Sequence, residues 1–152
     1  MLIQLNHHKI YVHQEALSVM EVFTQAQKDQ PEAGGIVLGK VKKDTIHVLK
    51  LSPPTELDKA SRRNFERHRL SAQIVINHEF YNSHQQMTYL GEWHTHPEDF
   101  PSPSGTDKKM IAEQFRTNKF HTPFLLLFIK GLKGLYVAVF EDDELTSCMI
   151  KV

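Results

Sequence analysis

Two pairs of polar residues in the second half of the sequence have the spacing of a metal site. His94 and His96 are two residues apart, so in an extended chain both imidazoles point to the same side. Ser104 and Asp107 are three residues apart at an expected helix start, where both side chains face one direction. The loop 97–103 between the two pairs contains three prolines, and it can bring the start of the helix close to the end of the strand. The segment therefore predicts two imidazoles, a carboxylate and a hydroxyl around one point.

This donor set is typical of a catalytic zinc site. Three protein ligands leave one position open for a water molecule, and water bound in such a site titrates near neutrality. We expect His94, His96 and Asp107 to be the ligands. Ser104 is expected to hydrogen-bond to the water or to a developing oxyanion. Nitrogen and oxygen ligands favour zinc and leave manganese or iron as less favoured alternatives.

A hydrolytic site also needs a group that takes a proton from water and passes it to the leaving amine. Glu32 is the best candidate, because it stands just before a strand that opens with Gly34 and Gly35, where the backbone can be approached closely. Glu32 could instead be a solvated loop carboxylate. The other groups also have simpler interpretations, since a His-x-His pair can be surface decoration and Ser-x-x-Asp can be a helix N-cap.

The periodicity of apolar residues predicts an α/β (α+β) fold, a central mixed sheet with about three helices packed on it. We treat residues 1–152 as a single domain. Helices are expected from Glu15 to about Gln27, from Leu70 to about Tyr81 and from Ser104 onward. Strands are expected at Met1–Leu5, Lys9–His13, Gly34–Val41, Thr45–Leu51, Tyr89–His94, Phe124–Ile129, Leu135–Phe140 and, as an edge, Thr146–Val152.

The composition excludes several classes of protein. Eighteen basic and eighteen acidic residues give zero net charge, which argues against a general nucleic-acid binder. The longest apolar run, Phe124–Ile129, is far shorter than a membrane span, and no signal peptide is recognisable. The single cysteine, Cys148, favours a reducing compartment and excludes a Cys-rich zinc module. We therefore expect a cytoplasmic protein that binds neither nucleic acid nor membrane.

Some residues around these motifs have two interpretations. The basic stretch Asp58–Leu70 can be a solvated helix face or the wall of a substrate groove. Trp93 should point away from the metal site into the core, whereas Glu92 points the same way as His94 and could support a ligand. Glu98 is expected to be exposed to solvent.

The pattern His94-Thr95-His96, seven residues, Ser104, two residues and Asp107 resembles the H-[ST]-H-x7-S-x2-D signature of the JAMM metallopeptidases, the catalytic members of the MPN/JAB domain family. The segment Glu32 to Gly39 (EAGGIVLG) resembles the part of that family that carries the general-base glutamate. The likeness extends from about Glu32 to Phe128.

The resemblance implies a cytidine-deaminase-like sandwich fold and one zinc ion held by His94, His96 and Asp107. It makes Glu32 the base that activates water and Ser104 the oxyanion stabiliser. The implied activity is that of an isopeptidase, which cleaves the bond after the extended C-terminal tail of a ubiquitin-like or similarly conjugated protein.

The short chain lacks room for the insertions with which eukaryotic members grip ubiquitin, and it looks most like bacterial members of antiphage (CBASS-type) operons. Those members remove a conjugated cGAS-like nucleotidyltransferase from its targets. Processing of another ubiquitin-like modifier or of a sulfur-carrier protein is an alternative, as is a metal-free MPN scaffold. A zinc deaminase is disfavoured because its cysteine ligands are missing.

Overall fold

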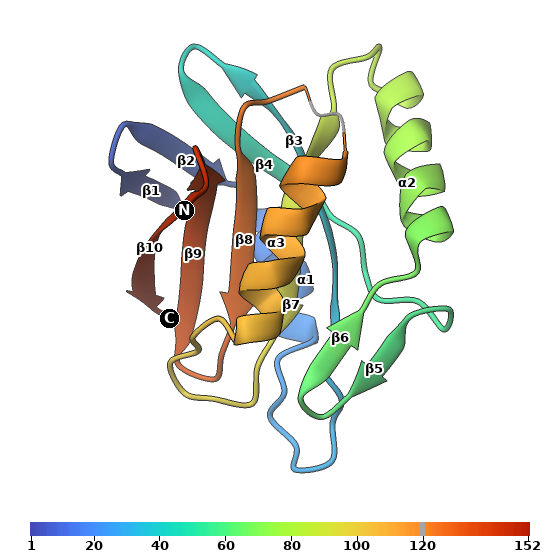
Figure 1. Ribbon diagram of the computed structural model, residues 1–152, viewed down its shortest axis with the longest axis vertical. Helices are drawn as coiled ribbons and strands as arrows, with labels where there is room; N and C mark the ends of the chain where they lie inside the picture. The colour runs from blue at the N-terminus through green and yellow to red at the C-terminus, as the bar shows by residue number, and fades with distance from the viewer. Residues whose placement is uncertain (119–120) are drawn as a thin grey trace.

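The structure is a computed structural model that describes residues 1–118 and 121–152, and its main feature is one curved, mixed sheet (Figure 1). The strand order is β1-β2-β4-β3-β7-β8-β9-β10, so β7 lies near the centre. The strands are β1 (Leu2–Leu5), β2 (His8–Val12), β3 (Gly34–Lys42), β4 (Thr45–Leu51), β7 (Thr88–Thr95), β8 (Leu125–Lys130), β9 (Gly134–Glu141) and β10 (Glu144–Lys151). A separate hairpin consists of β5 (Lys59–Ser61) and β6 (Asn64–Glu66).

The helices cover the two faces of this sheet. Helix α1 (Gln14–Val22) packs on one face through Ala16 and Met20, in the same apolar cluster as Trp93. Helices α2 (Arg69–Asn82) and α3 (Gly105–Thr117) pack on the other face. The predicted central mixed sheet with about three helices is confirmed for the described residues, within which no helix is long and apolar enough to cross a membrane.

Strand β7 is buried along almost its whole length and carries side chains to both faces. It runs antiparallel to β3 and parallel to β8. The register with β3 shifts beside Leu90 and Gly91, which is a bulge in the strand. Gly91 has a φ of 154°, and a Cβ atom there would lie 2.0 Å from the carbonyl oxygen of Leu126. The bulge therefore depends on glycine at this position.

The loop between β7 and α3 is held against the turn that joins β8 and β9. The backbone N–H groups of Leu132 and Lys133 donate to the carbonyl oxygens of Glu98 and Asp99, each at 2.8 Å. An ion pair between Lys133 and Asp99, with N···O 2.6 Å, adds a side-chain contact. These contacts and three prolines fix the path by which the chain returns from the end of β7 to the start of α3.

Three sequence predictions are wrong in detail. Helix α1 ends at Val22 rather than near Gln27, because Gln25 is turned inward and buried. The stretch Asp58–Leu70 is not a helix face, since most of it forms the β5–β6 hairpin and its connections, with α2 beginning only at Arg69. The last strand begins at Glu144, two residues earlier than expected, and it is an edge strand as predicted.

We expect Gly91→Ala to lower the free energy of unfolding by about 2 kcal/mol or more, because the new methyl group overlaps the β8 backbone. Urea denaturation measures this loss. Gly105→Ala is the matched control, since a Cβ there meets nothing within 4 Å and alanine favours the helix. Equal stability of the two variants would show that the bulge tolerates a side chain.

Candidate metal centre and active site

The end of β7 and the start of α3 bring two imidazoles and a carboxylate together. His94 Nε2 and His96 Nε2 are 3.2 Å apart. Asp107 places Oδ1 3.3 Å from His94 Nε2 and Oδ2 3.3 Å from His96 Nε2. Both histidines are buried, with 4% and 8% of their surface exposed. Two imidazole nitrogens and both oxygens of one carboxylate therefore face one another in a mostly buried cluster.

These distances fit a tetrahedral divalent ion. Zinc binds imidazole and carboxylate ligands at about 2.0–2.1 Å, which places neighbouring ligand atoms of a tetrahedron about 3.3–3.4 Å apart. The two imidazole nitrogens are 3.2 Å apart, close to this spacing, and each lies 3.3 Å from a different oxygen of the Asp107 carboxylate. The residues present can thus hold a zinc-type cation on one face and leave a fourth position open.

The electrostatics of the cluster favour a charged carboxylate. Burial opposes ionisation of Asp107, but hydrogen bonds from His94 and His96 hold the pKa of its carboxyl well below the usual range. Burial likewise opposes protonation of His96, yet the hydrogen bond to Asp107 and the nearby Glu32 raise its pKa. Asp107 therefore carries a negative charge that attracts a proton or a cation at this point.

Ser104 is the N-cap of α3 and orients Asp107. Its backbone N–H donates to Asp107 Oδ2 at 2.7 Å, and its Oγ accepts from the backbone N–H of Asp107 at 3.1 Å. This reciprocal capping box is the simpler interpretation of Ser-x-x-Asp, and the structure contains it. Because Ser104 Oγ acts there as an acceptor, its own proton is still available for a hydrogen bond.

Glu32 lies beside the cluster, although 62 residues separate it from His94 in the sequence. Its Oε1 is 3.8 Å from His96 Nε2, and only 5% of the residue is exposed, so it is not a solvated loop carboxylate. Burial raises its pKa to about 7, despite the lowering effect of His96. Two residues further on, a Cβ atom at Gly34 would lie 2.6 Å from both the Phe65 ring of β6 and the carbonyl oxygen of Trp93, so the close packing of these segments requires glycine there.

Two residues that the sequence analysis missed hold the Glu32 loop in place. Thr95 points to the opposite side of β7 from the two histidines and is fully buried. Its Oγ1 donates to Gln25 Oε1 at 3.0 Å and accepts from the Ala33 N–H at 3.0 Å. The amide of Gln25 donates in turn to the carbonyl oxygens of Gln30 and Arg62, both at 3.1 Å. Gln25 lies inside the helix expected from Glu15 to about Gln27, so the sequence carries no signal of its burial.

A second buried polar group lies next to the histidines on the same strand. Glu92 accepts hydrogen bonds from Arg67 Nε and Nη2 at 2.8–2.9 Å, from the Tyr89 hydroxyl at 2.6 Å and from Gln114 at 3.1 Å. These contacts join the segment after β6 to β7 and α3. Glu92 faces the same side as His94, as predicted, but the described residues that bind its carboxylate are Arg67, Tyr89 and Gln114, none of which is a candidate metal ligand.

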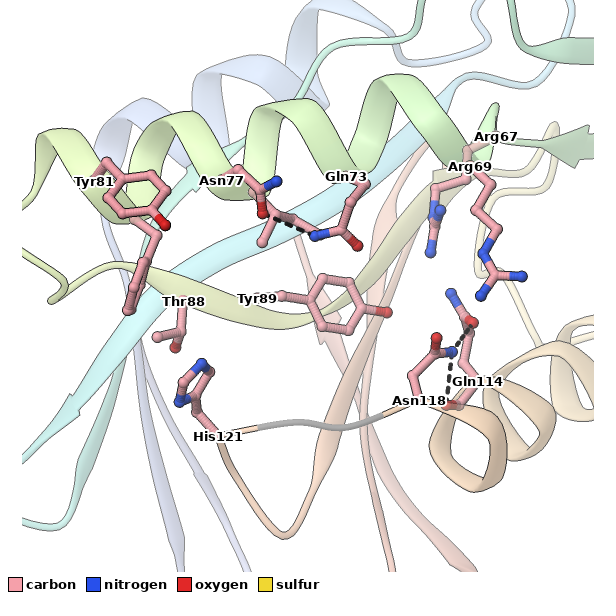
Figure 2. Close-up of a pocket in the computed structure, with 12 residues that line it drawn as sticks. Arg67, Arg69, Gln73, Asn77, Tyr81, Thr88, Tyr89, Gln114, Asn118 and His121 are labelled. Atoms are coloured by element: carbon pink, nitrogen blue, oxygen red, sulfur yellow. Dashed lines mark hydrogen bonds between the residues drawn. The ribbon is translucent and has the colours of Figure 1, made fainter.

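Two adjoining grooves begin at this network. One, of about 370 Å³, is lined by His94 and Asp107 together with residues of β6 and α3. The other, of about 410 Å³, lies between α2 and the end of α3, over β7 (Figure 2). Arg67, Arg69 and Gln114 line both grooves. The basic stretch therefore borders a groove that reaches the candidate metal centre.

The structure also places the remaining residues that the sequence analysis discussed. Trp93 is buried in the core, as predicted, and its Nε1 donates to the carbonyl oxygen of Ser52 at 3.0 Å. Glu98 is half exposed, as expected, with Oε2 3.9 Å from His96 Nδ1.

Comparison with known proteins finds a matching domain family, similar bacterial proteins and a solved structure of similar fold. A domain family described as prokaryotic homologues of the JAB domain matches residues 15–146. Three bacterial proteins that are similar to this chain are each named "CD-NTase/cGAS isopeptidase". The Vibrio cholerae protein is 34% identical over 116 residues, which cover 76% of this chain and 72% of that protein. The Escherichia coli protein is 34% identical over 128 residues, 84% and 80% of the two chains.

The third relative, from Pseudomonas aeruginosa, is 33% identical over 123 residues, 79% of this chain and 77% of that protein. Among solved structures, a protein from Desulfitobacterium hafniense superimposes with a TM-score of 0.64 at 20% identity. The superposition covers 93% of this chain and 90% of that one. At this identity the likeness shows the fold alone.

We expect Thr95→Val to lower the free energy of unfolding by about 1–3 kcal/mol, because Gln25 and the Ala33 N–H each lose a buried partner. Chemical denaturation measures the loss, and amide hydrogen exchange should become faster in residues 23–33. Thr88→Val is the matched control on the same strand, since its hydroxyl makes only a 3.4 Å contact with Gly39. If both variants behave alike, Thr95 does not anchor the loop.

Proposed function

Because the chain belongs to the family of prokaryotic homologues of the JAB domain, we propose that it is a zinc-dependent isopeptidase. Its proposed substrate is a cGAS-like nucleotidyltransferase (CD-NTase) joined through its C-terminal tail to another protein, and cleavage would reverse that conjugation in bacterial antiphage defence. The observation that carries the proposal is the buried cluster of His94, His96 and Asp107 with Glu32 beside it. The names of the three bacterial relatives support the substrate class.

In this proposal His94, His96 and Asp107 hold one zinc ion, as their mutual distances of 3.2–3.3 Å allow. Zinc supplies a Lewis acid that makes bound water acidic and polarises a carbonyl. Asp107 contributes the negative charge of the ligand set, and the capping box of Ser104 keeps that carboxylate directed at the histidines.

Glu32 and Ser104 perform the proton chemistry. Glu32 accepts a proton from the attacking water at its carboxylate while the water oxygen bonds to the scissile carbonyl carbon. It then donates that proton to the departing amine, so the carbon–nitrogen bond breaks and a carboxylic acid and an amine result, which ionise to a carboxylate and an ammonium group at neutral pH. The Ser104 hydroxyl, whose Oγ already accepts from Asp107 N–H, donates to the developing oxyanion.

The grooves next to the site suit an extended peptide tail. The groove that contains His94 and Asp107 adjoins the groove between α2 and α3 along Arg67, Arg69 and Gln114. The guanidinium of Arg67 is engaged by Glu92, whereas Arg69 is exposed at the junction. Arg69 is therefore the basic group placed to bind carbonyl or carboxylate oxygens of the tail.

Glu32→Gln is the variant that tests the mechanism. It should retain zinc but lower kcat by about 10²–10⁴-fold, because the amide has the size of the carboxylate but cannot accept the proton. The assay follows release of a conjugated CD-NTase on gels and zinc content by elemental analysis. Substantial cleavage by metal-loaded Glu32→Gln would remove Glu32 from the mechanism.

Glu98→Gln is the matched control for that experiment. Glu98 lies on the other side of the same imidazole, with Oε2 3.9 Å from His96 Nδ1, but it is half exposed. Its activity should stay within a few-fold of the wild type. If the wild-type protein leaves the CD-NTase conjugate intact and cleaves another ubiquitin-like conjugate, the proposed substrate is wrong while the chemistry stands.

Removal of the metal should abolish activity reversibly. We expect a chelator to stop cleavage and added zinc to restore it, and Asp107→Ala to lower the zinc content by one equivalent because a ligand is lost. Asp99→Ala, in the exposed ion pair with Lys133, is the control that keeps its zinc. Unchanged zinc content in Asp107→Ala would reject the ligand assignment.

A further inference from the structure

We propose that His7, His8 and Glu141 form a second binding site for a divalent cation of the zinc type, separate from the isopeptidase centre. The three side chains each offer one ligating atom, and these atoms all lie within 4.8 Å of one another. None of the three belongs to the site at His94, His96 and Asp107. The second site therefore does not depend on the proposed activity.

The three side chains lie close enough together to converge on one ion. Glu141 Oε2 is 3.3 Å from His7 Nε2 and 2.8 Å from His8 Nε2, and the two rings have centroids 4.0 Å apart. Adjacent residues of a strand point to opposite sides, so two neighbouring histidines rarely face one carboxylate. They do so here because His7 lies in the two-residue turn that precedes β2, where Asn6 has a φ of 51°.

The surroundings hold these ligands in place. His8 packs edge-on against the ring of Phe124, with centroids 5.4 Å apart, and only 12% of its side chain is exposed. The Glu141 side chain is 25% exposed and sits at the end of β9. Two imidazoles and one carboxylate form a common zinc ligand set, and His7, 71% exposed, leaves the remaining positions open to water.

The charge around the cluster also favours a cation. Glu141 begins a run of four acidic residues, Glu141 to Glu144, in the β9–β10 turn. The run leaves a concentrated negative charge beside two imidazoles, which bind metals in their neutral form. Lys9 follows His8 in sequence, but side chains alternate along β2, so Lys9 lies on the opposite side of the strand from His8. Its side chain is exposed there. A divalent ion would offset the acidic charge.

The site would join the two ends of the curved sheet. His7 and His8 belong to the β1–β2 hairpin at one edge, and Glu141 lies next to β10 at the other edge, 133 residues away from His8. The edge strands β1 and β10 also contact each other, and Figure 1 shows both on the same side of the molecule. His94 on β7 pairs with Ile129 on β8, which in turn pairs with Tyr136 on β9. Glu141 lies about 17 Å from Tyr136 along β9. The ion would thus stabilise the closed curvature and take no part in the reaction.

The experiment counts zinc per chain after equilibrium dialysis of the whole chain, residues 1–152. The wild type should bind two equivalents. His7→Ala and Glu141→Gln should each bind one, and so should His94→Ala, whereas His7→Ala combined with His94→Ala should bind none. His7 is exposed and Glu141→Gln is isosteric, so both variants should fold. His78→Ala, at an exposed histidine of α2, is the control and should bind two.

Thermal unfolding provides a second measurement. In the His94→Ala background, zinc at about 100-fold over its Kd should raise Tm by about 5 °C or more, and the added His7→Ala change should remove that rise. The second site is refuted if His7→Ala and Glu141→Gln both keep the wild-type stoichiometry, or if the wild type binds one ion that His94→Ala removes. One ion that His7→Ala removes would instead support the second site and reject the first.

Discussion

The whole arrangement depends on burying two imidazoles and a carboxylate against one another. Polar groups of this kind lose hydration when they leave water, and only partners at contact distance offset that loss. His94, His96 and Asp107 meet this condition at 3.2–3.3 Å. The requirement explains why α3 must begin at the tip of β7 and why the intervening loop is tied to the β8–β9 turn.

The alternation of side chains along β7 divides two tasks between neighbouring residues. His94 and His96 point into the candidate metal centre, while Thr95 between them points to the other side and binds Gln25 and Ala33. Because Ala33 follows Glu32, the hydrogen bond from the Ala33 N–H to Thr95 Oγ1 ties the backbone next to that carboxylate to β7. One strand end thus positions both the ligands and the candidate base, which belong to segments more than 60 residues apart.

The buried Glu92 links this centre to the substrate side. Burial and the neighbouring Glu92 raise the pKa of Tyr89 well above its usual range, so the phenol keeps its proton and donates it to that carboxylate. Arg67, in the segment before α2, forms an ion pair with the same Glu92 carboxylate. Such a pair costs desolvation, which its multiple hydrogen bonds offset. It joins the groove wall at Arg67 to the strand that carries His94.

Local sequence patterns determined the directions of the candidate site residues and the positions of most helices and strands. Strand alternation sets the direction of His94 and His96, and a helix start sets that of Ser104 and Asp107, because both depend on backbone geometry over a few residues. The apolar periods predicted most strands and all three helices of the described residues.

Only the tertiary structure decided the contacts between distant segments. The approach of Glu32 to His96, the inward turn of Gln25 that shortens α1, and the pairing of Arg67 with Glu92 are examples. The hydrogen bond between His8 of β2 and Glu141 of β9 is another example. No local propensity encodes such contacts, because their energy comes from desolvation and packing that exist only once the sheet has curved and the loops have closed over it.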